Sequence, residues 1–376
     1  MKVVTLFGTR PEIIRLSAVI RMLDRFCTNV LVHTGQNYDP LLSDVFFQEL
    51  AVRLPDVHLG IGDSSGFASQ AAAILEKSGE VLLRERPDRV LILGDTTSGL
   101  SAIVAARLGI PVYHMEAGNR CYDDRVPEEI NRRVIDHSST VLMPYTERSK
   151  DNLVREGIER ERIFVTGNPI FEVLNHYRQE IDSSHALESL GVTEKGYLLV
   201  TLHRAENVDR PARLARILGA LAAAGQAHAL PVLVSVHPRT ADRMKEFGVG
   251  GSGLTLLRPL GFFDFVRLEK RARAVLSDSG TVQEECAIFG VPNVTLRDVT
   301  ERAETVECGS NVLSGSGPED IARALALALD AGTDWSAPRE YIVPRVSRTV
   351  AKIVLGYTSI RRHGGPGDQE DSLGKV

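Results

Sequence analysis

Short apolar runs rich in β-branched residues alternate with amphipathic helical patterns along almost the whole chain. The predicted strands are residues 3–7, 30–33, 90–93, 112–115, 140–143 and 163–166, then 197–201, 232–236, 254–257, 274–277 and 293–295. Continuous apolar strands separated by helices are typical of parallel sheets covered on both faces. The sequence therefore predicts an α/β fold of doubly wound parallel sheets.

The two series of strands predict two domains in this chain of 376 residues. The first domain is expected at 1–175 and the second at 176–343. A final helix at 344–361 follows a proline-rich joint and is expected to return to the first domain. The tail 362–376 is polar and rich in glycine, and we expect it to be disordered.

Composition excludes several classes of protein. The net charge is −5, with acidic and basic residues mixed along the chain, so neither a nucleic-acid surface nor a polybasic membrane patch is expected. No apolar run reaches membrane-spanning length, and the first predicted strand begins at residue 3, so we expect no signal peptide. The four cysteines lie far apart without metal-ligand spacing, so we expect no metal site and reduced thiols in the cytoplasm.

The segment 274–285 (AVLSDSGTVQEE) joins an apolar strand to a helix through a Ser/Gly turn. The first N–H groups of a helix lack internal partners and attract anions, and small residues let a phosphate approach them. Ser279 and Gly280 are therefore candidates for binding a diphosphate, and a carboxylate of the acidic pair Glu284 and Glu285, about one turn later, for binding ribose hydroxyls. A capped βα turn without a ligand is the alternative.

Carboxylates follow the strands of the first half. Asp95 comes directly after residues 90–93 and Glu116 directly after 112–115, while Glu128 opens the next helix. Ligands of open α/β sheets lie beyond the carboxyl ends of the strands, so these three groups are candidates for acid–base chemistry. A helix cap for Asp95 and ordinary helix-start chemistry for Glu128 are the alternatives. Arg10, after the first strand, is a candidate phosphate ligand or a surface arginine.

Basic and aromatic residues follow the strands of the second half. His203 and His237 occupy equivalent strand ends and are candidate phosphate or leaving-group contacts. Phe262, Phe263 and Phe265 precede the Ser/Gly turn, where one of the three rings is a candidate to stack on a base and the others to pack into the core. The charged loop 295–302 ends in Arg302.

Other signatures are missing. No G-x-G-x-x-G follows the first strand with an acid some twenty residues later, so no nicotinamide cofactor is indicated. No nucleophile elbow appears either. The remaining chemistry is acid–base catalysis on a bound sugar nucleotide, with no cofactor.

The ordered set of motifs resembles the non-hydrolysing UDP-N-acetylglucosamine 2-epimerase family. The matching words are G-T-R-P-E at 8–12, T-G-Q at 34–36, L-G-D-T at 93–96, M-E-A-G at 115–118, P-E-E-x-N-R at 127–132, H-R at 203–204, H-P at 237–238, S-D-S-G at 277–280 and R-D-x-T-E-R at 297–302. The resemblance implies a GT-B-like fold with two Rossmann-type domains, an active site in the cleft between them, and a homodimer.

The resemblance also implies a reaction. Family members eliminate UDP from UDP-GlcNAc to leave 2-acetamidoglucal, then add it back to give UDP-ManNAc, without NAD. By resemblance, Asp95, Glu116 and Glu128 form the acid–base set and His203 acts as a leaving-group contact or acid. The expected substrate ligands are Arg10, Arg15, His203, His237, Phe265, Ser279, Gly280, Glu285 and Arg302.

Two residues depart from the family pattern: Arg15 replaces a lysine, and Thr281 replaces the second glycine of S-D-S-G-G. The loop 119–126 resembles branches that epimerise other UDP-2-acetamido sugars, such as 6-deoxy-L-hexoses or diacetamido uronates, in polysaccharide or antibiotic sugar biosynthesis. Three further functions stay open at the level of sequence: a hydrolysing 2-epimerase, a GT-B glycosyltransferase and a non-catalytic sugar-nucleotide sensor.

Overall fold

The computed structural model describes residues 1–36, 40–62 and 66–357. The chain forms two compact units: one contains Met1–Pro169 together with the segment that begins at Arg345, and the other is Ile170–Pro344. The expected tail 362–376 and the last residues of the expected helix 344–361 lie outside the described residues.

The first unit contains a six-stranded sheet with the order β3-β2-β1-β4-β5-β6, in which every described pair of strands is parallel. Its strands are β1 Lys2–Phe7, β2 Thr28–His33, β3 Val57–His58, β4 Arg89–Leu93, β5 Val112–Met115 and β6 Val141–Met143. The order reverses direction beside β1, as in a doubly wound fold, so the carboxyl ends of β1, β4 and β5 meet at one edge.

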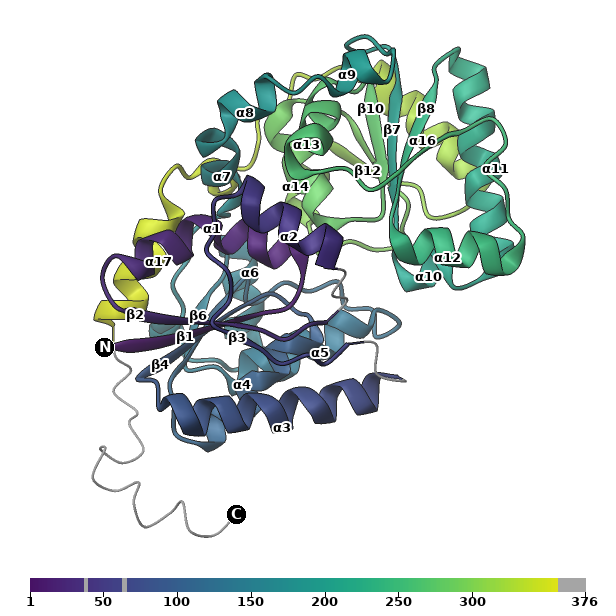
Figure 1. The fold of residues 1–376 in the computed structure, drawn as a ribbon. Coiled ribbons are helices and arrows are strands. Elements are labelled where there is room, and N and C mark those ends of the chain that lie inside the picture. Colours follow the sequence, from purple (N-terminus) through teal and green to yellow (C-terminus); the bar gives the residue numbers. More distant parts are fainter. Residues whose placement is uncertain (37–39, 63–65, 358–376) are drawn as a thin grey trace. The chain divides into compact units, whose positions relative to one another are not determined.

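Helices cover both faces of this sheet (Figure 1). They are α1 Arg10–Asp24, α2 Pro40–Glu49, α3 Phe67–Glu85, η1 Thr97–Leu100, α4 Ser101–Arg107, α5 Pro127–Ser138, α6 Glu147–Arg155, η2 Arg160–Arg162 and α17 Val346–Gly356. The last of these packs against α1, and the hydroxyl of Tyr113 on β5 donates to the carbonyl of Tyr357 at 2.6 Å. The end of the chain that the structure describes is thus anchored in the first unit.

The second unit repeats the architecture with the strand order β12-β11-β10-β7-β8-β9, again with parallel pairs. Its strands are β7 Leu198–Leu202, β8 Val232–Val236, β9 Thr255–Leu257, β10 Ala274–Ser277, β11 Asn293–Thr295 and β12 Asn311–Leu313. Its helices are α7 Ile170–His176, α8 Arg178–Asp182, α9 Ala186–Ser189, α10 Ala205–Val208, α11 Pro211–His228, α12 Pro238–Phe247, α13 Phe262–Arg271, α14 Gly280–Phe289, α15 Ala303–Glu307, α16 Pro318–Asp330 and η3 Arg339–Ile342.

The central strands of each sheet are buried on both faces, which explains their continuous apolar character. On β7, Leu198, Val200 and Leu202 face one cluster of core residues. Tyr197 and Leu199 face a second cluster on the opposite side of the sheet. Successive side chains of a strand point to opposite faces, so a strand between two helical layers must be apolar at every position.

One sequence expectation was wrong in detail. Residues 163–166 do not form a strand: a single bridge joins Ile163 to Leu142, the middle residue of β6. The expected α/β class with two doubly wound parallel sheets is confirmed.

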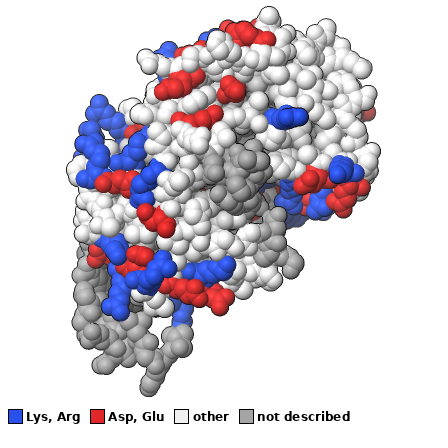
Figure 2. All heavy atoms as spheres, viewed as in Figure 1, with Lys and Arg blue, Asp and Glu red and all other residues white. Residues whose placement is uncertain are grey.

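Charges are distributed without a single-sign region on the face seen in Figure 2, where acidic and basic side chains are interspersed. Among the described residues, no helix combines the length and the apolar character needed to cross a membrane.

Candidate active site

The turn after β1 is held by Glu12. This buried carboxylate accepts hydrogen bonds from the backbone N–H groups of Gly8 and Thr9, both at 2.7 Å, and from the hydroxyl of Thr96 at 2.8 Å. Glu12 and Thr9 form a capping box at the start of α1. Because Thr96 lies beyond β4, Glu12 joins the loops at the ends of two neighbouring strands.

Burial raises the pKa of Glu12 from its usual 4.5 to about 7, although its hydrogen bonds act in the opposite direction. Between pH 4.5 and about 7, Glu12 therefore keeps its proton in the folded protein, whereas the same group has lost it in the unfolded chain. Its contribution to stability is therefore present in full below pH 4.5 and is lost as the pH rises through about 7.

We expect the free energy of unfolding of the wild type to lose about 3 kcal/mol from this group between these two pH values. Denaturant titrations at several pH values should show the wild-type curve falling more steeply than that of Glu12→Gln, which cannot ionise. Parallel curves for the two proteins would contradict the assignment.

Asp95 lies two residues beyond the end of β4 and is held by α5. Its Oδ2 accepts from Arg132 Nε at 2.8 Å and lies 2.6 Å from Nη2 in an ion pair, and Asn131 donates to the backbone carbonyl of Asp95 at 3.0 Å. The N-cap of the following helix η1 is Thr96. Asp95 is therefore not the helix cap that the sequence offered as an alternative, and its carboxylate is fixed by a guanidinium instead.

Glu116 lies directly beyond β5, beside the strand that precedes Asp95. It is buried and has a left-handed backbone, with φ of 64°. Its Oε2 accepts from Arg15 Nη1 at 2.5 Å and from the hydroxyl of Tyr145 at 3.3 Å. A Cβ placed on Gly94 would lie 3.9 Å from the same oxygen, so the turns after β4 and β5 are in contact. Arg15, at the position where the family has a lysine, thus supplies the buried cation that neutralises this carboxylate.

Glu128 lies in the first turn of α5 and is half-buried. The next residue, Glu129, has a structural role: it is fully buried and accepts from the backbone N–H groups of Cys121 and Tyr122, both at 3.1 Å, and from Arg132 at 2.8 Å. The first turn of α5 therefore fixes the start of the loop 119–126 through Glu129 and leaves the neighbouring Glu128 partly accessible.

A buried polar cluster holds the turns that carry Asp95 and Glu116. Asp136, near the end of α5, contacts His114 Nδ1 at 2.9 Å, Arg120 Nη2 at 2.8 Å and the backbone N–H of Gly118 at 3.2 Å. The other ring nitrogen of His114 lies 2.9 Å from the carbonyl of Gly94. Helix α5 thus holds the Asp95 turn through Arg132 and the Glu116 turn through Asp136.

Arg10 is the first residue of α1 and is half-buried. Its guanidinium lies over the ring of Phe46, 5.6 Å from the ring centre. The structure therefore places Arg10 at the carboxyl edge of the first sheet, as expected from the sequence.

In the second unit, Asp278 organises the turn after β7. This fully buried carboxylate accepts from the backbone N–H groups of His203 at 3.1 Å and Arg204 at 3.0 Å, and from Asn207 Nδ2 at 3.1 Å. His203 Nδ1 lies 3.2 Å from the same carboxylate. A carboxylate at this nitrogen fixes the orientation of the imidazole.

His237 begins α12, where its Nδ1 accepts from the backbone N–H of Arg239 at 3.2 Å. Its ring lies 5.6 Å from that of His203, between ring centres. The structure thus brings the two histidines together and shows that His237 is also a helix cap.

The Ser/Gly turn after β10 begins α14, with Ser279 at the N-cap and Gly280 as the first helical residue. A Cβ placed on Gly280 would lie 2.9 Å from Glu301 Oε1 and 3.5 Å from the guanidinium carbon of Arg302. Arg302 is held by an ion pair with the buried Glu284. The backbone N–H groups of a helix start and a guanidinium therefore lie together at the carboxyl end of β10, which suits a phosphate group.

Glu285 is buried on α14 beside Glu269 of α13. Burial, followed by the negative charge and the hydrogen-bonding carboxyl of Glu285, raises the pKa of Glu269 well above its usual value. Within the described part of the chain, no donor reaches the buried Oε2 of Glu269. Two carboxylates this close in the interior do not readily both ionise, which favours a proton on Glu269.

Phe265 is half-buried on α13 and packs against the core cluster on one face of the second sheet. Part of the ring thus has the packing role that the sequence offered as one alternative.

A sequence model described as UDP-N-acetylglucosamine 2-epimerase matches residues 22–355. The chain is also 41% identical, over 350 residues, to a UDP-N-acetylglucosamine 2-epimerase of Methanocaldococcus jannaschii, an alignment that covers 90% of this chain and 95% of the relative. The chain belongs to the UDP-N-acetylglucosamine 2-epimerase family. The resemblance stated from the motifs is confirmed.

Other members of the epimerase family are similar along the same length. A crystal structure of the M. jannaschii UDP-GlcNAc 2-epimerase in complex with UDP-GlcNAc and UDP has a TM-score of 0.89 at 38% identity and covers 94% of this chain and 99% of that one. A UDP-2,3-diacetamido-2,3-dideoxy-D-glucuronate 2-epimerase of Pseudomonas aeruginosa is 38% identical over 335 residues, 88% of this chain and 92% of the relative. The fold is GT-B-like, with two Rossmann-type domains.

Sequence reasoning missed the residues that hold the candidate site of this epimerase family member in place. These are Glu12, His114, Arg132, Asp136 and Asp278. One signal was available: His114 interrupts an otherwise apolar strand, and a polar residue inside a buried strand requires a partner.

Proposed function

We propose that this chain is a non-hydrolysing UDP-N-acetylglucosamine 2-epimerase that interconverts UDP-GlcNAc and UDP-ManNAc. The observation that carries the proposal is the pair of carboxylates, Asp95 and Glu116, at the carboxyl ends of neighbouring strands, each fixed by a guanidinium. Family membership supports the same reaction.

The proposed reaction has two steps. A carboxylate removes the proton from C2 while the C1–O bond to UDP breaks, which leaves 2-acetamidoglucal, with a C1–C2 double bond, and UDP, both still bound to the protein. UDP then attacks C1 again, and a proton is delivered to the opposite face of C2. We propose Asp95, Glu116 and Glu128 as the groups that move these protons.

The leaving UDP carries the negative charge that develops during elimination. We propose that the N–H groups at Ser279 and Gly280, together with Arg302 and His203, stabilise this charge, because Arg302 lies beside Gly280 and His203 is oriented by Asp278. Arg10, Arg15 and His237 are proposed as further substrate ligands, Glu285 as the ribose ligand and Phe265 as the uracil contact.

Incubation with UDP-GlcNAc in D2O tests the proposal. Proton NMR should show deuterium at C2 and the formation of UDP-ManNAc. The same assay should be repeated with a UDP-2-acetamido-6-deoxy-L-hexose and with the diacetamido uronate on which the P. aeruginosa relative acts. Absence of C2 exchange with every sugar would refute an epimerase. Stoichiometric release of free UDP would indicate hydrolysis, and transfer to an added acceptor would indicate a glycosyltransferase.

The motif resemblance supports two further parts of the proposal: assembly as a homodimer, and a place in the cytoplasm in polysaccharide or antibiotic sugar biosynthesis. Light scattering coupled to size-exclusion chromatography measures the first directly.

A further inference from the structure

A second polar pocket lies in the C-terminal unit, at the opposite end of its sheet from the Ser/Gly turn. It has a volume of about 480 Å³ and is lined by residues that precede strands: Lys195 before β7, Arg273 directly before β10 and Pro292 directly before β11. The Ser/Gly turn follows the carboxyl end of β10. This basic pocket is therefore separate from the proposed diphosphate site.

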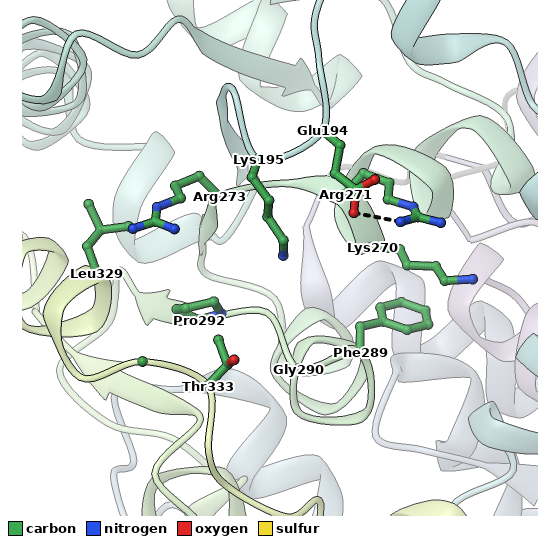
Figure 3. Close-up of a pocket in the computed structure, with 11 residues that line it drawn as sticks. Glu194, Lys195, Lys270, Arg271, Arg273, Phe289, Gly290, Pro292, Leu329 and Thr333 are labelled. Atoms are coloured by element: carbon green, nitrogen blue, oxygen red, sulfur yellow. Dashed lines mark hydrogen bonds and ion pairs between the residues drawn. The ribbon is translucent and has the colours of Figure 1, made fainter.

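Four cations and one anion line the basic pocket: Lys195, Lys270, Arg271 and Arg273 against Glu194. Two of the cations have anionic partners, because Arg271 pairs with Glu194 at 2.6 Å and Lys270 pairs with Asp182 at 2.7 Å. Among the described residues, no ion pair or side-chain hydrogen bond is found for Lys195 or Arg273. Figure 3 shows Lys195 extending into the middle of the pocket and Arg273 on the side of Pro292 and Leu329.

The end of helix α13 explains the presence of two of the four cations in the basic pocket. Lys270 and Arg271 occupy the last turn of α13, where cations are favoured by the helix dipole. Lys195 and Arg273 lie outside any helix. Partial desolvation in the pocket lowers the pKa of the exposed Lys195, and the charges of Arg273 and Arg271 lower it further, against the opposing effect of Glu194. An anion between Lys195 and Arg273 would remove this repulsion.

We propose that the basic pocket binds a small polyanion bearing phosphate groups, held by Lys195 and Arg273. Its volume lies within the range of about 300–1,000 Å³ that is usual for ligand sites. Phe289, Pro292 and Leu329 add apolar surface beside the two cations, which suits a phosphorylated compound that also has an uncharged part. Binding in this pocket does not depend on the proposed function.

Inorganic tripolyphosphate is the probe, titrated by calorimetry into the full-length protein already saturated with UDP, which occupies the proposed diphosphate site. We expect binding that weakens as salt is added. The variant Lys195→Ala/Arg273→Ala should bind the probe roughly tenfold or more weakly, because it loses two charged contacts. The control Arg348→Ala/Lys352→Ala removes the same two residue types from exposed positions on α17 and should bind like the wild type.

Three results would contradict the proposal that the basic pocket binds a polyanion: no binding of tripolyphosphate by the wild type, full binding by Lys195→Ala/Arg273→Ala, or equal losses of affinity in both double variants. Thermal melts check that both variants are folded, which we expect because all four side chains are exposed. If UDP fails to bind and C2 exchange is absent, the proposed function fails. The affinities of the two double variants for tripolyphosphate still show whether the basic pocket binds the probe.

Discussion

Replacing Asp95 by asparagine is expected to slow the exchange of the C2 proton of UDP-GlcNAc by about 10²–10⁴-fold, the range typical of a lost general acid or base. Asparagine has nearly the same shape, and its amide oxygen can still accept from Arg132, which now holds the carboxylate at 2.8 Å and 2.6 Å. Proton NMR in D2O measures the exchange, and calorimetry with UDP should show unchanged affinity.

Asp24→Asn is the matched control. Asp24 ends α1 and pairs with Arg53 at 3.0 Å, so the same chemical change again affects an aspartate held by an arginine. This position is at the opposite end of α1 from the strand-end turns. Exchange should proceed at the wild-type rate in Asp24→Asn. A wild-type rate in Asp95→Asn would remove Asp95 from the acid–base set.

Replacing Gly118 by alanine is expected to destabilise the protein by about 2–5 kcal/mol and to abolish exchange. The backbone of Gly118 has φ of 79°, and a Cβ there would lie 2.2 Å from the carbonyl oxygen of Ser149. Left-handed backbone costs an alanine about 1–2 kcal/mol, and overpacking adds about 1–3 kcal/mol. The strain falls two residues from Glu116. Denaturant unfolding and the D2O assay measure the two effects.

Gly157→Ala separates the two causes. Gly157 has a similar φ of 89°, but no atom of the described residues lies within 4 Å of an added Cβ. This variant should lose only about 1–2 kcal/mol and should keep its activity. Equal stability losses in both variants would show that backbone conformation alone decides the effect, and that the contact with Ser149 contributes nothing.

The alternation of apolar strands and helices was enough to predict the architecture, because a strand buried on both faces has to be apolar throughout. Very short elements escaped this reasoning. Strand β3 has two residues, too few to show any periodicity, and β12, with three, was also not predicted. Both lie at the edge of a sheet and take their conformation from the strand beside them.

Placement of the carboxylates followed from the same pattern, since Asp95 and Glu116 come directly after strands that proved to be neighbours. The arginines that bind these carboxylates could not be predicted from the strand pattern. Arg132 reaches Asp95 across 37 positions of sequence, and Arg15 reaches Glu116 across 101. Such contacts depend on the packing of helices against the sheet, which local patterns do not specify. Asp278 was visible in its motif, but its role needs the turn after β7, some 75 positions earlier.

The contacts of Glu129 limit which part of the loop 119–126 can be exchanged to alter the sugar that an enzyme of this family accepts. Its carboxylate fixes the backbone of Cys121 and Tyr122, so the loop 119–126 has an anchored start. Asp124 and Arg125, further along, are exposed. Loop exchange between relatives can therefore be confined to the stretch after Tyr122. A graft that keeps Glu129 and the two N–H groups it binds preserves the register of α5, and with it the positions of both Asp95 and Glu116.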